Sequence, residues 1–285
     1  MAVAAALLIG LITNLLLDGT LAWQIAPIIV MSLLMASAGF AEDLKGLSVK
    51  LRIGMQLALS AVLAFWLLSA LGISVWWSLP LALVGVFYID ADNFMDGVNG
   101  ISSFQGIASG AMAVVVGSIV DSAPLMVAGV LCATVFLGFL PWNFPKAKMF
   151  LGDSGSYLLG GMTFGLAIMT WAKTVSVLAA IAPMLIYSAD VLFTLGQRAL
   201  RRVDLTESHN EHLYQVVKRK TDSHVIAALY PFGFTVLICT VALLQITGAI
   251  ALPVAWILVA LLVAGYLILG NRLRVQELRV LEVKR

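Results

Sequence analysis

Charged residues are scarce in this sequence, and long apolar runs take their place. Only 11% of the 285 residues are Asp, Glu, Lys or Arg and 61% are hydrophobic, whereas an average soluble domain has about 25% charged and about 45–50% apolar residues. The mean hydropathy is +1.03. Because a soluble fold of this size cannot bury so much apolar surface, the composition excludes a soluble enzyme and a disordered chain.

Cysteine is also rare, and basic residues are missing from the start of the chain. Cys132 and Cys239 both lie inside apolar runs, so they are expected to be packed thiols, and a secreted disulfide scaffold is excluded. The first ten residues contain no Lys or Arg, so they lack the positive start of a cleavable signal peptide. This segment is expected to be a retained membrane span.

The apolar runs predict an all-α, polytopic helix bundle in a membrane. A bilayer core about 30 Å thick needs about 20 residues per helix, which fits about ten spans. No repeat or low-complexity linker divides the chain, so residues 1–285 are expected to form a single membrane-embedded domain. The expected spans cover residues 2–17, 21–40, 53–73, 76–89, 104–120, 125–141, 157–171, 175–195, 225–245 and 249–269.

The polar residues are collected on one face of this predicted bundle. With ten spans, the loops after even-numbered spans and the C-terminal tail carry every basic residue except Lys173, together with most of the acids and all three histidines. The positive-inside rule makes this face cytoplasmic. A transporter usually needs polar or broken helices near the bilayer midplane, so this arrangement favours an active site that faces the cytoplasm.

Residues 90–100 hold three carboxylates and two asparagines at the expected end of a span. Charge in that position is costly unless it is paired or bound to a cation. Asn93, Asp96 and Asn99 are spaced by three, so in a helix they would share one face. We interpret this segment as part of a binding or catalytic site.

Other polar segments allow a structural and a functional interpretation. Residues 152–156 could open a helix whose free amides hold phosphate while Asp153 takes a metal, or they could be a plain helix cap. His209 and His212 could be ligands or a surface pair. The pair Glu42-Asp43 could belong to an ordinary charged loop, and the basic cluster Arg198, Arg201 and Arg202 could be a topological anchor. Together these segments indicate Mg²⁺-assisted chemistry on a phosphorylated ligand.

Four sequence blocks, in this order, resemble the polyprenyl-phosphate N-acetylhexosamine-1-phosphate transferases, a glycosyltransferase family 4 type that includes WecA, WbpL and MraY. The blocks are residues 39–43 with 47–52, residues 93–100, residues 143–156 and residues 209–215. The histidine block resembles the WbpL branch and lacks the three-histidine run typical of MraY.

The resemblance implies an enzyme that transfers N-acetylhexosamine-1-phosphate from a UDP-amino sugar to undecaprenyl phosphate and releases UMP. Such a reaction starts a lipid-linked cell-envelope glycan, for example the O-antigen of lipopolysaccharide. The implied setting is the bacterial inner membrane, with the lipid bilayer as a partner, no nucleic acid, and a homodimer left open. The alternative is a transporter or an inactive scaffold for lipid-linked sugars.

The resemblance also implies roles for individual residues. Carried over, the catalytic residues are Glu42, Asp43, Asp96, His209 and His212, the substrate-binding residues are Asn99, Phe150, Lys50 and Arg52, and the ligands of Mg²⁺, or of Mn²⁺ in its place, are Asn93 and Asp153. Asp43 would deprotonate or position the lipid phosphate. Phe150 would stack on uracil beside Asn99, and Lys50, Arg52 and the two histidines match the region that holds the diphosphate.

Three departures from the family pattern accompany the resemblance. Glu42 stands where Asp is usual, and Asn99 replaces a common Asp. The chain also begins at the span that normally follows a first helix and a Pro-Thr-Pro-Arg-Gly-Gly-Gly-type loop. The expectation is therefore that the first helix and first cytoplasmic loop of the family are missing from these 285 residues.

Overall fold

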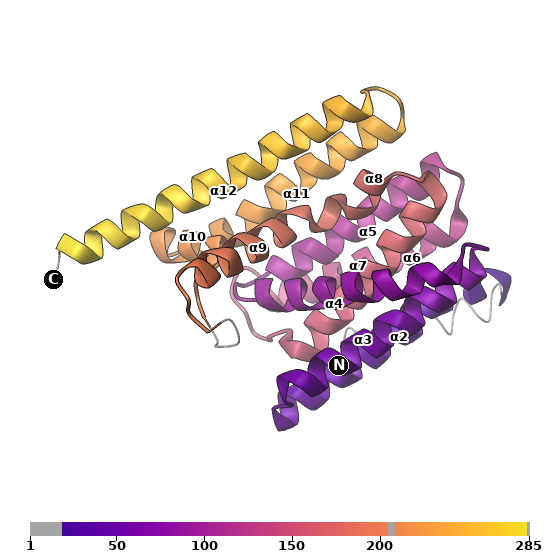
Figure 1. The fold of residues 1–285 in the computed structure, drawn as a ribbon, viewed down its shortest axis with the longest axis horizontal. Helices are drawn as coiled ribbons and strands as arrows, with labels where there is room; N and C mark the ends of the chain where they lie inside the picture. The colour runs from indigo at the N-terminus through magenta and orange to yellow at the C-terminus, as the bar shows by residue number, and fades with distance from the viewer. Residues whose placement is uncertain (1–18, 205–208, 284–285) are drawn as a thin grey trace.

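The computed structural model describes residues 19–204 and 209–283, and its regular elements are all helical (Figure 1). The helices are α2 (Gly19–Lys45), α3 (Val49–Ala70), η1 (Val75–Trp77), α4 (Ser78–Met95), α5 (Ile101–Ile119), α6 (Ala123–Asn143), α7 (Gly152–Thr174), α8 (Val177–Ile181), η2 (Ala182–Met184), α9 (Leu185–Leu200), α10 (Leu213–Thr221), α11 (His224–Ile246) and α12 (Leu252–Val283).

The helix lengths and compositions confirm a polytopic membrane bundle. Within the described residues, eight helical segments are long and apolar enough to cross a bilayer: Trp23–Lys45, Val49–Ala70, Val75–Met95, Ile101–Ile119, Ala123–Asn143, Val177–Leu200, His224–Ile246 and Leu252–Glu277. The predicted span 2–17 lies outside the described residues. The predicted span 157–171 falls in α7, which has 23 residues but is not among these eight.

Helix α7 is less apolar than these eight spans because it is surrounded by protein and not by lipid. It packs against α2, α4, α5 and α3, and 16 of its residues are buried. Its glycines allow close contact: a Cβ at Gly160 would lie 2.5 Å from the Cα of Ile89 in α4, and one at Gly165 would lie 2.8 Å from Ile28 in α2. Small residues of this kind let helices approach in lipid.

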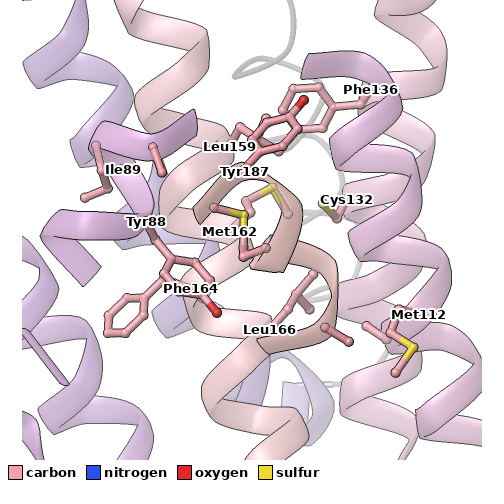
Figure 2. Close-up of a cluster of buried hydrophobic side chains, with 14 of the residues drawn as sticks. Tyr88, Ile89, Met112, Cys132, Phe136, Leu159, Met162, Phe164, Leu166 and Tyr187 are labelled. Carbon is pink, nitrogen blue, oxygen red and sulfur yellow. The ribbon is translucent and has the colours of Figure 1, made fainter. Parts of the chain in front are cut away.

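The apolar core forms around α7 (Figure 2). Met162 and Phe164 of α7 lie among side chains from the neighbouring helices, including Phe136 of α6 and Tyr187 of α9. Cys132 also lies in this cluster, and both Cys132 and Cys239 are free and buried, which confirms the prediction of packed thiols.

The last helix is longer than a bilayer requires. Helix α12 has 32 residues, whereas about 20 residues suffice to cross the hydrocarbon core. Its C-terminal part runs beside α10 and continues past it (Figure 1). The helix therefore reaches the end of the bundle at which α10 and the polar loops lie.

Candidate active site

The four sequence blocks converge at one end of the bundle. The last turn of α2, the first turn of α3, the end of α4, the first turn of α7 and the start of α10 all contribute polar side chains there. A polar cavity of about 450 Å³ lies between the start of α3, the end of α4 and the segment that leads into α10, while the residues of α2 and α7 lie outside its lining. Its lining consists of Val49, Arg52, Ile53, Asp90, Asn93, Phe94, Asp96, Gly97, His209, Asn210, His212, Tyr214 and Gln215.

The carboxylate of Asp43 caps the N-terminus of α7. Its Oδ1 accepts a hydrogen bond from the backbone N–H of Asp153 at 3.1 Å, and its Oδ2 accepts one from the N–H of Ser154 at 3.2 Å. The expectation that these amides are free for phosphate is therefore wrong. A carboxylate satisfies unpaired N–H groups at a helix start and complements the helix dipole.

Close packing of α2 on α7 makes this cap geometrically feasible. A Cβ at Gly39 would lie 2.2 Å from the backbone oxygen of Asp153, so no larger residue fits there without movement. Gly39 is one turn before Asp43 on α2, and together they fix the end of α2 against the first turn of α7. The position of Asp153 thus depends on residues more than 100 positions earlier.

The two predicted metal ligands are in direct contact. The amide nitrogen of Asn93 donates to Asp153 Oδ1 at 2.8 Å and to Ser156 Oγ at 3.0 Å. Within residues 19–204 and 209–283, no three or more His, Cys, Asp or Glu side chains are grouped as a metal site. A carboxylate, an amide oxygen and a cavity with room for phosphate oxygens and water nevertheless fit the preference of Mg²⁺ for few protein ligands.

Asp96 lies at the end of α4 as its C-cap, because the helix stops at Met95. The backbone then turns and α5 starts at Ile101, so the expectation that Asn93, Asp96 and Asn99 share one helical face is wrong. Ser102 Oγ donates to Asp96 Oδ1 at 2.6 Å. Burial raises the pKa of Asp96 to about 6, and the negative charge of Asp153 adds to the rise while the Ser102 bond opposes it.

Basic and acidic residues of the first block meet at the cavity wall. Arg52 lines the cavity, and its Nη1 lies 3.6 Å from Glu42 Oε1. The other oxygen of Glu42 accepts the N–H of Leu47 at 2.9 Å, so Glu42 also closes the turn between α2 and α3. Lys50, which was predicted to hold the diphosphate, is exposed in the first turn of α3 and does not line the cavity.

Both predicted histidines line the cavity. Their ring centroids are 5.0 Å apart, and His212 is 2% exposed, so the interpretation of the two as a surface pair is wrong. Burial lowers the pKa of His209, and the nearby His212 and Arg198 lower it further. The N–H of His212 donates to the side chain of Gln215 at 3.1 Å, and this bond helps to start α10.

Two arginines of the basic cluster at the end of α9 contact the histidine block, residues 209–215. Arg198 is 3% exposed and its Nη1 donates to Glu211 Oε1 at 2.9 Å, while Arg201 pairs with the other oxygen of Glu211. Arg202 is exposed. The contacts of the first two arginines are thus with the residue next to His212.

Asn99 and Phe150 are not among the residues that line the cavity. The side-chain amide of Asn99 donates to the carbonyl of Pro145 at 3.0 Å. Asn143 ties the same two segments together, since its Oδ1 accepts the N–H of Gly100 at 2.6 Å and its Nδ2 donates to the carbonyl of Met149 at 2.8 Å. Phe150 is 81% exposed, so its ring is accessible to a planar ligand.

Two acids of the site, the half-buried Asp90 and the buried Asp190, were not among the predicted site residues. Asp90 lines the cavity and accepts a hydrogen bond from Gln56 at 3.0 Å, and Asp190 contacts His212 Nδ1 at 3.0 Å. Asp90 and Asp92 were expected after the fourth span, but they lie inside α4, which runs to Met95. The available signal was a charge within an apolar span, which is costly and therefore indicates a function.

Similar proteins come from several bacteria. The chain is 26% identical over 274 residues to a probable undecaprenyl-phosphate N-acetylglucosaminyl 1-phosphate transferase of Bacillus subtilis, covering 89% of this chain and 76% of that protein. It is 27% identical to an undecaprenyl-phosphate alpha-N-acetylglucosaminyl 1-phosphate transferase of Thermotoga maritima, covering 68% and 62%. It is 33% identical to a decaprenyl-phosphate N-acetylglucosaminephosphotransferase of Mycolicibacterium smegmatis, covering 53% and 42%.

These relatives agree with the resemblance found in the sequence, although they do not single out the WbpL branch. The last two are matched over less than two thirds of their own length. The family model for Glycosyl transferase family 4 matches residues 25–171, which is just over half of the chain. This range contains the first three sequence blocks, with Asp43, Asn93 and Asp153. The chain therefore belongs to glycosyl transferase family 4.

Proposed function

We propose that this protein transfers N-acetylhexosamine-1-phosphate from a UDP-amino sugar to undecaprenyl phosphate and releases UMP. The observation that carries the proposal is the polar cavity, where Asn93 and Asp96 face Arg52 and the two histidines at one end of an apolar bundle. Both reactants are anionic, so a site for this reaction needs cations to offset their repulsion before attack on phosphorus. The relatives are named for transfer of the same kind of sugar phosphate to polyprenyl phosphates.

Each group of residues has a separate task in this proposal. Arg52, His209 and His212 bind the diphosphate of the donor from the cavity wall. Asp153 and Asn93, with Asp96 near them, would hold Mg²⁺, or Mn²⁺ in its place, and the bound ion would offset negative charge on the phosphate oxygens. Because both oxygens of Asp43 are bonded to amides of α7, the proposed role of Asp43 is to position Asp153.

We place the site at the cytoplasmic face of a bacterial inner membrane. The support is the basic composition of the segments around the cavity, which include Lys45, Lys50 and residues 218–220, since cytoplasmic loops carry the excess of Lys and Arg. The product would start a lipid-linked cell-envelope glycan. The histidine block resembles the WbpL branch, and this resemblance supports a glycan of the O-antigen type.

The test is release of UMP by the purified protein in lipid nanodiscs. The assay supplies undecaprenyl phosphate, Mg²⁺ and one member of a panel of UDP-N-acetylhexosamines at a time. We expect UMP only when donor, acceptor and metal are all present, and the sugar that gives the highest kcat/KM identifies the donor. If no donor gives UMP above background, the proposal is wrong and a transporter or inactive scaffold remains.

Phe150→Ala is expected to weaken donor binding more than it slows turnover. An aromatic ring that stacks on a base contributes about 1–3 kcal/mol, so KM for the UDP-sugar should rise about tenfold while kcat changes little, as for loss of uniform binding. Steady-state kinetics with saturating acceptor measure both values. Met149→Ala is the control, because it shortens the adjacent exposed apolar side chain without removing a ring. A collapse of kcat at unchanged KM would contradict the stacking role.

A further inference from the structure

Asp190 is a buried carboxylate that accepts several hydrogen bonds, from hydroxyl groups and from backbone N–H groups. It lies in α9 and is 0% exposed. Its Oδ1 accepts from Thr194 at 3.2 Å and contacts His212 Nδ1 at 3.0 Å. The backbone N–H of Leu213 donates to both of its oxygens at 3.1 Å, and Tyr266 OH donates to Oδ2. All of its hydroxyl and backbone partners are donors, so both oxygens of Asp190 act as acceptors here.

This arrangement fixes the state of the His212 ring. A carboxylate can only accept, so the ring nitrogen that faces it, Nδ1, must carry a proton. His212 also lines the polar cavity. Since Nδ1 is committed to Asp190, the nitrogen left for a ligand in the cavity is Nε2. A buried carboxylate that holds an imidazole in one orientation is a general device for functional histidines.

The C-terminal helix α12 holds this pair in place. Tyr266 of α12 reaches Asp190 with its hydroxyl group. Arg274 donates to the carbonyl of Glu211, the residue before His212. A Cβ at Gly270 would lie 2.9 Å from the Cβ of Leu213, so α12 lies directly against the start of α10. The histidine block, residues 209–215, is thus held between α9 and the part of α12 that lies beside α10 (Figure 1).

We propose that Asp190 is the positioning residue of His212, and that Tyr266 of α12 supports it. Asp190 holds the ring through the proton on Nδ1, so that Nε2 of His212 is directed into the cavity, where an N–H group at Nε2 would donate to a diphosphate oxygen of the donor. This proposal rests on the proposed function for the identity of the ligand, while the state of the imidazole ring can be measured without it.

A purely structural role would give different results. Asp190 also accepts the N–H groups of Leu213 and Tyr214 at the start of α10, and such a cap could stabilise the helix without concerning His212. In that case Asp190 and His212 variants would lower activity independently. If Asp190 acts through His212, removing either should make the other irrelevant, which a double-mutant cycle detects.

The experiment compares Asp190→Asn, His212→Gln and the double variant in the UMP assay, at equal amounts of protein that elutes as a single species in detergent. We expect Asp190→Asn to lower kcat/KM about 100-fold, the upper range for loss of a partner that orients a functional imidazole. The double variant should be no worse than His212→Gln alone. Additive losses, or an Asp190→Asn variant with unchanged kinetics, would overturn the proposal.

If the Asp190→Asn protein does not fold in sufficient amounts, a milder pair of variants tests the same proposal. Tyr266→Phe removes one donor from Asp190, and Tyr230→Phe removes a hydroxyl that donates to the carbonyl of Tyr266 and does not contact Asp190. We expect a loss of kcat/KM for Tyr266→Phe and none for Tyr230→Phe, at similar melting temperatures. Equal kinetics for the two variants would contradict the support assigned to Tyr266.

The ring itself can be observed by nitrogen NMR of protein labelled with ¹⁵N-histidine. The chain has three histidines, so His212→Gln identifies the signals of His212 by difference. We expect Nδ1 of His212 to carry a proton in the wild-type protein. An unprotonated Nδ1 would refute the positioning role even in an active enzyme, whereas a protonated Nδ1 without UMP release would refute only the proposed function.

Discussion

Asp153→Asn is expected to abolish transfer without disturbing the helix bundle. The side chain lies in the first turn of α7, where Oδ1 accepts a hydrogen bond from Asn93 at 2.8 Å, and an Asn oxygen can still accept that bond. What the variant loses is the negative charge that would hold the metal. Since such an ion supplies several kcal/mol of transition-state stabilisation, kcat should fall by at least about 100-fold.

The stability of this variant separates a functional carboxylate from a structural one. The charge of Asp153 raises the pKa of the nearby Asp96, so removing that charge relieves repulsion between two acids. The melting temperature of Asp153→Asn should therefore be unchanged or higher, as is common when a functional residue is replaced. Asp121→Asn, in the turn between α5 and α6, is the matched control and should keep full activity. Near-normal turnover of Asp153→Asn at saturating Mg²⁺ would rule out the metal assignment.

Asp43→Asn, by contrast, should lower both activity and stability. Asp43 accepts the N–H groups of Asp153 and Ser154 with its two oxygens, and an Asn can offer only one acceptor and no charge. Loss of a helix cap costs about 1 kcal/mol, and the first turn of α7 that moves carries Asp153. We expect a lower melting temperature and a fall in kcat of about 100-fold, because small misplacements at a reacting centre have effects of this size.

Glycine variants test the same positioning without touching a carboxylate. A Cβ at Gly39 would lie 2.2 Å from the backbone oxygen of Asp153, whereas one at Gly54 in α3 would have no atom within 4 Å. Overpacking costs about 1–3 kcal/mol, so Gly39→Ala should lose activity and Gly54→Ala should not. If Asp43→Asn is inactive at an unchanged melting temperature and Gly39→Ala is fully active, Asp43 acts directly on the acceptor phosphate.

The membrane bundle could be predicted because lipid imposes it residue by residue. Each span that faces lipid needs about 20 apolar residues, so the apolar runs alone located the eight spans that are long and apolar enough within the described residues. Helix ends were less certain, since they depend on local contacts. Asp90 and Asp92 were placed after a helix that in fact contains them, because the apolar run stops before the helix does.

The sequence also determined which chemistry is present, because the carboxylates, amides, histidines and arginines of the site stand in short motifs beside the spans. Their partners were decided only by the tertiary structure. Asp43 caps a helix 110 residues later, Asn93 bonds Asp153 across 60 residues, and Asp190 lies against His212 across 22. Such contacts exist because α2 and α4 pack on α7, and α12 on α10. Packing of this kind depends on the shapes of facing side chains, and no periodicity within one segment of the chain encodes it.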